Sequence, residues 1–230
     1  MFKRMRFSVR VPRLPRVLSC LCLTMLTMAL LLTWTLLRHS RSFTQTCHHS
    51  EAFQDGLHAL GDRVHRLLVS LGLTHFLCYG SLWGQLRLSR TLPWERDIEL
   101  CVLNEEMALK DEVFLERQFR KNNMQLAYDS TDGKYTITDD TLPDARVELI
   151  VFEEDPMVAM LRRVGWKRRV LPSDCESLPS LSCFPPRLIK TPLPSREFGG
   201  YIIPVPREGI EIQKYHYPDN WWKEVLPKNC

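Results

Sequence analysis

The sequence predicts an α+β domain with a mixed sheet and flanking helices, preceded by a single N-terminal transmembrane helix. Three observations lead to this fold class. Residues 17–37 form an uncharged apolar run. Beyond it, short runs of β-branched and aromatic residues alternate with segments whose apolar residues recur every three or four positions. The resulting order is helix, strand, strand, helix, hairpin, strand, which is typical of a mixed sheet packed against helices.

Residues 17–37 are long enough to span a bilayer, because 21 residues in a helix reach about 30 Å. A cleaved signal peptide is the alternative. The apolar core of such a peptide is shorter, however, and no small-x-small cleavage site follows Leu37. We therefore expect a signal-anchor that attaches the chain to the membrane.

The basic residues around this run predict its orientation. Six of them precede it, whereas only Arg38 and Arg41 follow closely, so the N-terminus is expected in the cytoplasm. The chain then divides into a cytoplasmic tail (1–16), the span, a stem (38–50) and a lumenal domain (51–230). This organisation predicts a single-pass type II membrane protein of the Golgi or ER.

The charge balance excludes one class of partner. Residues 1–41 hold eight basic and no acidic residues, which leaves 23 basic and 27 acidic residues in the remainder. The sequence pI of 8.6 therefore reflects the anchor. Nucleic acid is not expected as a partner.

Six cysteines fall on the oxidising side of the membrane in this topology: Cys47, Cys78, Cys101, Cys175, Cys183 and Cys230. Fully bridged, they would allow fifteen pairings. We expect a Cys175–Cys183 disulfide, because both residues lie in a proline-rich loop that a bridge would pin. Cys78 and Cys101 fall in predicted strands, where buried free thiols are expected. A zinc site is not expected, since no C-x2-C or H-x3-H spacing occurs.

The first half of the lumenal domain is expected to contain two helices and two strands. Residues 51–71 form an amphipathic helix, because their apolar positions recur at threes and fours. Residues 75–79 form a core strand that enters a tight turn at Gly80–Ser81, and residues 97–103 form a second strand. Residues 105–121 form a helix with acids early and bases late, as the helix dipole favours.

The second half is expected to be richer in strands. Residues 124–129 and 134–138 pair as a hairpin around Asp132–Gly133, since Asp-Gly suits a hairpin turn. Residues 147–152 are a strongly β-branched and aromatic strand. Residues 171–196 contain six prolines and are therefore expected to be loop.

Carboxylates on two predicted strands are candidate metal ligands. Asp97 and Glu99 lie on one face of their strand, about 7 Å apart. Oxygen donors so placed can share a hard divalent cation such as Mg²⁺ or Mn²⁺. Glu148 lies inside another apolar strand, where an unpaired charge is costly, and is the candidate third ligand. The alternative is a sheet face open to solvent, where alternate charges are ordinary.

The Gly80–Ser81 turn closes a predicted strand and opens a predicted helix over residues 82–88. Backbone N–H groups at a helix start bind phosphate, and a small residue there lets phosphate approach. No GK[ST] follows, so this turn is not a P-loop. Arg87 offers a planar fork that suits a phosphate oxygen, and a surface ion pair is the alternative.

Together these features resemble the nucleotidyltransferase fold, and within it the LicD and fukutin-related protein family. Members of that family typically read Y-G-[ST]-L-L-G-x-x-R, then I-P-W-D-x-D-[IV]-D. The corresponding residues here are Tyr79, Gly80, Ser81, Leu82, Gly84, Arg87, Leu92, Pro93, Trp94, Glu95, Asp97, Ile98 and Glu99. The P-x-P at Pro204 and Pro206, followed by Trp221 and Trp222, is also similar to the end of that family.

The resemblance implies transfer of a phosphorylated alcohol, such as phosphocholine or ribitol phosphate, from a CDP-linked donor to a hydroxyl of a glycan or glycoprotein. In that reaction, Asp97 and Glu99 would hold Mg²⁺ or Mn²⁺ on the donor's diphosphate. Glu148 would hold a second metal or take the acceptor's proton. The resemblance further implies that the phosphate is bound by Gly80, Ser81 and Arg87.

The sequence departs from the family at Glu95 and Glu99, where aspartate is usual. The extra methylene shifts a ligand in a geometry that Mg²⁺ enforces tightly. Two alternatives therefore stay open. One is a catalytically degenerate relative that acts as a binding or accessory protein in glycosylation. The other is a glycosyltransferase that uses Asp97-Ile98-Glu99 as a D-x-D motif, against which the Gly80–Ser81 turn argues.

Overall fold

The computed structural model describes residues 22–35 and 48–223. Residues 22–35 are helical. Within the described ranges, no helix is both long and apolar enough to cross a membrane. The expected span, residues 17–37, extends beyond the described part of the chain at both ends, and it stays a prediction.

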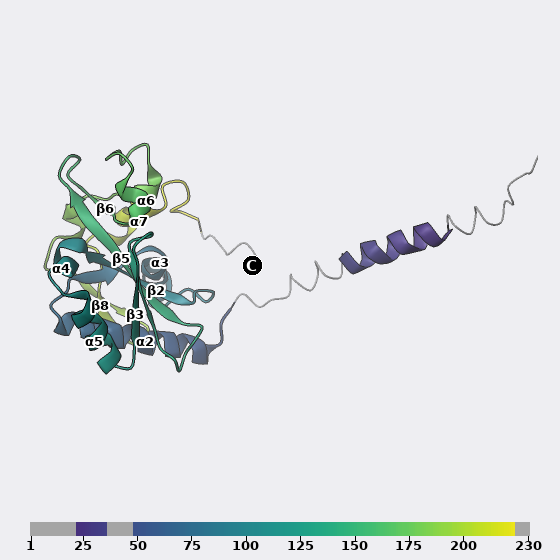
Figure 1. The fold of residues 1–230 in the computed structure, drawn as a ribbon, viewed down its shortest axis with the longest axis horizontal. Coiled ribbons are helices and arrows are strands. Elements are labelled where there is room, and N and C mark those ends of the chain that lie inside the picture. Colours follow the sequence, from purple (N-terminus) through teal and green to yellow (C-terminus); the bar gives the residue numbers. More distant parts are fainter. Residues whose placement is uncertain (1–21, 36–47, 224–230) are drawn as a thin grey trace, which may run out of the picture. The chain divides into compact units, whose positions relative to one another are not determined.

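The described residues fall into two units, the helix of residues 22–35 and the domain of residues 48–223. The second unit contains these elements in chain order (Figure 1): α2 (Glu51–Ser70), β1 (His75–Leu77), α3 (Tyr79–Leu88), β2 (Asp97–Leu103), α4 (Asn104–Ala108), α5 (Glu112–Lys121), β3 (Gln125–Asp129), β4 (Lys134–Thr138), β5 (Arg146–Asp155), β6 (Met160–Arg163), α6 (Trp166–Arg169), β7 (Ser195–Phe198), β8 (Tyr201–Pro204) and α7 (Gly209–His216). Short 3-10 turns at Pro179–Leu181 and Pro186–Ile189 lie in the proline-rich stretch.

A six-stranded sheet organises this unit, with the strand order β1-β2-β5-β4-β3 and β6 paired with β5. β2 and β5 are parallel, whereas the other neighbouring strands are antiparallel. β7 and β8 form a separate hairpin. The predicted mixed sheet with flanking helices is therefore confirmed, and the predicted hairpin is β3–β4.

The helix α2 covers one face of the sheet. It begins where the Ser50 side chain accepts a hydrogen bond from the Phe53 N–H, which satisfies one of the free donors of the first turn. Leu57 is fully buried on the inner side of this helix. A Cβ atom at Gly61 would lie 2.5 Å from Ile98 Cδ1 of β2, so helix and strand are in close contact there. Figure 1 shows the helix beneath the strands.

The opposite face of β2 and β5 carries charged residues. Successive side chains of a strand point to opposite faces, and the apolar residues of both strands that face α2 are fully buried. Asp97 pairs with Arg146, and Glu99 pairs with Glu148, in the parallel register of the two strands. The sheet thus brings Asp97, Glu99 and Glu148 onto one face of two adjacent strands.

The single helix predicted over residues 105–121 is wrong, because two helices occupy this stretch. α4 ends at Ala108, and α5 begins after Asp111, whose side chain accepts a hydrogen bond from the Phe114 N–H. Asp111 is thus an N-cap inside the predicted helix. The side chain of Leu109 between the two helices is 83% exposed.

Two disulfides join described residues, and the sequence predicted one of them but not the other. The Cys175–Cys183 bridge is confirmed. The expectation of free thiols at Cys78 and Cys101 is wrong, because these residues form a disulfide with a Cα–Cα distance of 5.9 Å. The antiparallel pairing of β1 with β2, in which Phe76 lies opposite Cys101, brings the two cysteines together. Both bridges suit an oxidising compartment.

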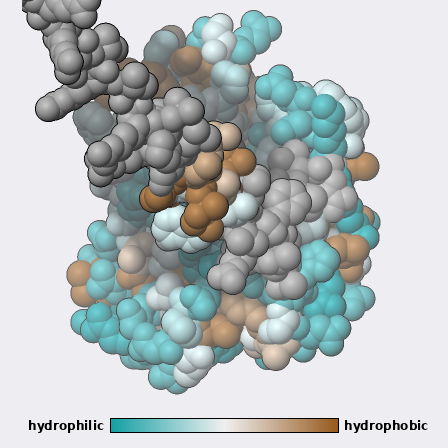
Figure 2. Space-filling model, turned by 90° about the vertical axis from the view of Figure 1, so that its right-hand side faces the viewer, coloured by the Kyte–Doolittle hydropathy of each residue, from teal (hydrophilic) through white to brown (hydrophobic). Residues whose placement is uncertain are grey.

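The surface of the unit is mostly polar. The face in Figure 2 is largely hydrophilic, with small hydrophobic areas between the polar ones. Exposed apolar side chains such as Leu109, Met157 and Trp166 lie in separate parts of the chain: the α4–α5 connection, the β5–β6 connection and α6. Single apolar side chains on a surface are ordinary.

Candidate functional site

The first turn of α3 is joined to β2 through Glu99. The Gly80 N–H donates to Glu99 Oε2 at 2.7 Å, and the Glu99 N–H donates to Ser81 Oγ at 2.7 Å. The Cys78–Cys101 disulfide links the same two elements. A carboxylate is favourable at a helix N-terminus, and here that carboxylate is a residue of the chain itself.

Tyr79, which opens α3, has a strained backbone. Its φ of 46° lies in the left-handed region, which non-glycine residues rarely adopt. Gln213 Nε2 of α7 donates to the Tyr79 carbonyl oxygen at 2.7 Å. The Tyr79 ring stacks on His216 with 4.0 Å between centroids. Packing against α7 therefore holds the turn that positions Gly80 and Ser81.

The carboxylates of Glu95 and Glu99 lie beside Gly80, and Asp97 interacts with both of them. A Cβ atom on Gly80 would lie 3.1 Å from Glu95 Oε1 and 3.2 Å from Glu99 Oε2. Burial, together with the charge of Asp97 and a hydrogen bond to it, raises the pKa of Glu95 to about 7. Burial, together with the charges of Asp97 and Glu95, raises the pKa of Glu99 to about 8. Such repulsion between like charges is relieved by a bound cation.

Glu148 is surrounded differently. Its Oε1 accepts from Lys134 Nζ at 2.7 Å and from Arg146 Nε at 3.1 Å. The Arg146 guanidinium also donates through Nη2 to Asp97 Oδ2 at 2.8 Å. Two cations thus neutralise the β5 carboxylate, and one of them reaches across to β2.

A pocket of about 190 Å³ opens next to the carboxylates. It is lined by Gly80, Trp83, Arg87, Leu92, Trp94, Glu95, Tyr217, Asn220 and Lys223. The Arg87 guanidinium carbon lies 4.6 Å from the centroid of the Trp83 ring, which is cation–π distance. The pocket therefore combines aromatic side chains with two cations, Arg87 and Lys223, and with the carboxylate of Glu95.

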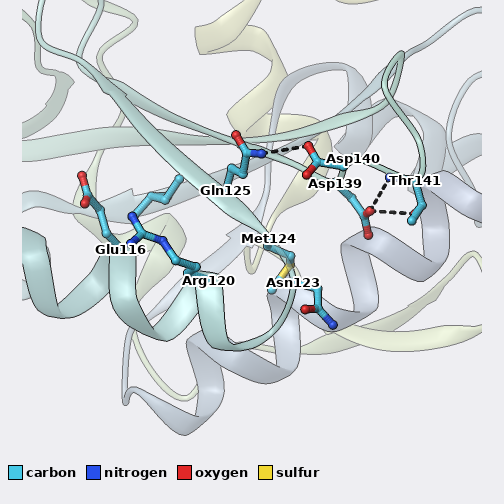
Figure 3. A pocket seen from close by; sticks show the side chains of 9 residues that line it. Glu116, Arg120, Asn123, Met124, Gln125, Asp139, Asp140 and Thr141 are labelled. Carbon is cyan, nitrogen blue, oxygen red and sulfur yellow. Dashed lines mark hydrogen bonds between the residues drawn. The ribbon is translucent and has the colours of Figure 1, made fainter.

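A larger pocket, of about 580 Å³, lies between α5 and the β4–β5 connection (Figure 3). Two pairs of its lining residues are joined by hydrogen bonds. The Thr141 N–H and hydroxyl donate to Asp139 Oδ1 at 2.8 and 2.6 Å, and Gln125 donates to Asp140 at 2.8 Å. The hydrogen bonds from Thr141 and the ion pair with Arg63 lower the pKa of Asp139 to about 2. The smaller pocket adjoins the carboxylates and is the candidate functional site.

The structure brings Asp97, Glu99 and Glu148 together, with Gly80 and Ser81 beside them and Arg87 in the adjoining pocket. Sequence reasoning did not assign roles to three nearby residues: Glu95, Lys134 and Arg146. Glu95 had a signal, because it occupies an aspartate position of the family motif. Lys134 and Arg146 carried no such signal in the sequence, because their approach to Glu148 depends on how the strands pair and in which register.

Glu95, Asp97 and Glu99 suit a hard cation in their chemistry, because they offer several carboxylate oxygens close to one another. In the part of the chain that the structure describes, no group of three or more His, Cys, Asp or Glu side chains is arranged so that it could hold a metal ion as it stands. The oxygens are engaged instead by Arg146 and the Gly80 N–H. A cation would have to compete with these partners.

The family model described as "LicD/FKTN/FKRP, nucleotidyltransferase domain" matches residues 72–208, which include all the carboxylates discussed above. No curated protein matches the chain. Among solved structures, the lincomycin-bound lincosamide antibiotic adenylyltransferase LnuA superposes with a TM-score of 0.45 and 8% identity, over 79% of this chain and 92% of that chain. That likeness is too weak to carry a functional argument.

Proposed function

The chain belongs to the LicD/FKTN/FKRP family of nucleotidyltransferase domains, and from this premise we propose that it transfers a phosphorylated alcohol from a CDP-linked donor to a glycan hydroxyl. The reaction would need Mg²⁺ or Mn²⁺. One observation carries the proposal: the carboxylates of Glu95 and Glu99 lie beside Gly80 in the first turn of α3, and the charge of Asp97 acts on both of them. The pocket of about 190 Å³ adjoins them.

Glu95, Asp97 and Glu99 would hold the cation. When bound, it would stabilise the charge that develops on the transferring phosphoryl group. Glu99 also holds the first turn of α3 in place. Its carboxylate accepts from the Gly80 N–H, and its backbone N–H donates to Ser81 Oγ. The strand thereby positions the helix start against which the donor's phosphates would lie.

The adjoining pocket suits the nucleotide part of the donor. Trp83, Trp94 and Tyr217 offer aromatic faces, and bases stack on such faces with little dependence on sequence. Arg87 and Lys223 at the same pocket suit the diphosphate. These cations would repel a quaternary ammonium, so the choline end of a CDP-choline donor would lie outside this pocket.

The expected setting is the lumen of the Golgi or ER, reached through the predicted N-terminal anchor. The two disulfides within residues 48–223 support a secretory compartment. A glycan or glycoprotein is the acceptor most consistent with that setting.

A degenerate relative is the second candidate, and a specific observation favours it. The Glu99 carboxylate is bound to the Gly80 N–H, and Asp97 is bound to Arg146, so the chain itself occupies groups that substrate and metal would need. Such a protein would bind a glycan or a partner enzyme without turnover. A glycosyltransferase of the D-x-D type remains the third candidate.

The test uses the purified full-length chain with Mg²⁺ or Mn²⁺ and a panel of CDP-alcohols and nucleotide sugars. We expect CMP release, and we expect Asp97→Asn to reduce it by at least about 10²-fold. Glu116→Gln, a carboxylate change in the larger pocket, is the matched control and should leave the rate unchanged. UMP or UDP release would favour the glycosyltransferase. Absence of both release and nucleotide binding would favour the degenerate relative.

A further inference from the structure

The side chain of Arg146, a residue of β5, links the two strands that carry the site. β2 and β5 are parallel, and Asp97 lies directly opposite Arg146 in their register. The guanidinium donates through Nη2 to Asp97 Oδ2 at 2.8 Å and through Nε to Glu148 Oε1 at 3.1 Å. One planar group therefore bridges the carboxylates of adjacent strands.

A second cation reinforces this bridge on the β5 side. Lys134 of β4 lies 2.7 Å from the same oxygen, Glu148 Oε1. The Glu148 side chain is only 10% exposed, so this carboxylate is largely shielded from solvent as well as neutralised. A metal ion at Glu148 would have to displace Arg146 and Lys134 from a partly buried position.

The surroundings of Glu95 and Glu99 have a different character. Glu95 Oε1 and Glu99 Oε2 both lie within about 3.2 Å of the point where a Gly80 Cβ would stand. That point is open because residue 80 is glycine. Two carboxylate oxygens therefore lie close together at Gly80, whereas Asp97 Oδ2 and Glu148 Oε1 are bound by the Arg146 guanidinium.

Resting on the proposed function, we propose that Arg146 is a tethered cation that takes the place of a second metal ion between Asp97 and Glu148. The chain would then bind one divalent cation, at Glu95, Asp97 and Glu99. Glu148 would be a positioning residue that orients Arg146, and it would contribute no metal ligand.

The chemistry of arginine suits this role. In two-metal phosphoryl-transfer sites, a pair of ions about 3.5–4 Å apart is held between shared carboxylates. A guanidinium is permanently charged and presents several donors in one plane, so it can bind two carboxylates at once without a metal. It supplies a fixed positive charge, and its retention does not depend on the concentration of free metal.

The first test measures Mn²⁺ stoichiometry by electron paramagnetic resonance on the full chain, without donor or turnover. We expect one bound Mn²⁺ per wild-type chain and two per Arg146→Met chain, because the vacated space between Asp97 and Glu148 becomes available. Arg120→Met, an exposed arginine on α5, is the matched control and should bind one. Arg146→Met that still binds one ion would overturn the proposal, as would two ions in the wild type.

A second variant keeps the test independent of how Arg146→Met folds. Glu148→Gln should change the Mn²⁺ affinity of the wild-type site by less than about 3-fold, whereas Asp97→Asn should weaken it by at least about 10-fold. A loss of affinity in Glu148→Gln equal to that in Asp97→Asn would make Glu148 a ligand and refute the inference.

Failure of this inference can be separated from failure of the proposed function. CMP release that Asp97→Asn abolishes supports the transferase whatever the number of ions. If neither the wild type nor Arg146→Met binds Mn²⁺ and no CMP appears, the proposed function falls and the inference falls with it. If only Arg146→Met binds the ion, Arg146 blocks the site entirely, and the single-cation arrangement is refuted.

Discussion

The two faces of β2 and β5 differ sharply although they belong to the same strands. On the face toward α2, side chains such as Leu100 and Leu149 are completely buried. One residue away on each strand, Glu99 and Glu148 lie on the opposite face and pair in register. The alternation of side chains along a strand thus separates residues that stabilise the sheet from residues that form the candidate site. A shift of one residue in register would exchange the two sets.

The apolar face should govern the stability of the domain. Leu149→Ala removes a fully buried side chain and should lower the free energy of unfolding by about 3 kcal/mol, because the cavity is only partly filled by its neighbours. Asp97→Asn on the other face should change it by less than about 1 kcal/mol, since an ion pair accessible to solvent contributes little. Urea denaturation followed by fluorescence measures both. Equal losses in the two variants would contradict this division between the faces.

The position of α3 against the polar face should depend on Gly84. A Cβ atom there would lie 2.3 Å from the Arg90 carbonyl oxygen and 3.0 Å from the Leu92 nitrogen. Backbone atoms cannot move aside as side-chain ends do, so Gly84→Ala should cost about 2 kcal/mol and displace the first turn of α3. We expect CMP release to fall along with the melting temperature.

Gly209→Ala is the matched control for this change. Its Cβ atom would meet only side-chain ends, Leu86 Cδ2 at 3.3 Å and Leu82 Cδ1 at 3.6 Å, so its effect should stay within about 0.5 kcal/mol. Gly84→Ala could instead melt at the wild-type temperature and retain activity. In that case the close packing of α3 on residues 90–92 does not position the site.

The features that could be predicted from the sequence depend on local pattern. The period of apolar residues in α2 and the alternation along β2 report directly which side of each element is buried. Those patterns were enough to place Asp97 and Glu99 on one face. The strand-to-helix junction near Gly80–Ser81 could be predicted because small residues there are a local signal as well. Its bounds were wrong, since β1 ends at Leu77 and α3 begins at Tyr79, which places Gly80 and Ser81 inside the helix.

The features that could not be predicted depend on which strands pair and in which register. Cys78 and Cys101 are separated by 23 positions, and only the antiparallel pairing of β1 with β2 brings them together. Arg146 meets Asp97 because a parallel register aligns two strands that lie far apart in the sequence. The break between α4 and α5 is a different case, since Asp111 is a recognisable N-cap that the charge pattern of residues 105–121 concealed.

The helix α2 also contains a titratable residue, His58, whose effect on stability should be smaller than that of the changes above. It is 4% exposed, its Nε2 accepts from the Thr91 N–H at 3.2 Å, and the charged groups near it are Arg90 and Asp55. Burial, and then the charge of Arg90, lowers the pKa of His58 from 6.5 to about 4. Between these values the unfolded chain binds a proton that the folded chain does not bind, so stability is full above pH 6.5 and is lost as the pH falls toward 4.

We expect His58 to account for about 1–2 kcal/mol of this loss. His58→Gln retains an acceptor for the Thr91 N–H but cannot titrate, so the stability of that variant should fall less between pH 7 and pH 4.5. His48→Gln changes an exposed histidine and should follow the wild-type curve. Urea denaturation at a series of pH values measures the three proteins. If His58→Gln and the wild type lose stability in parallel as the pH falls, the buried His58 of α2 does not contribute to acid sensitivity.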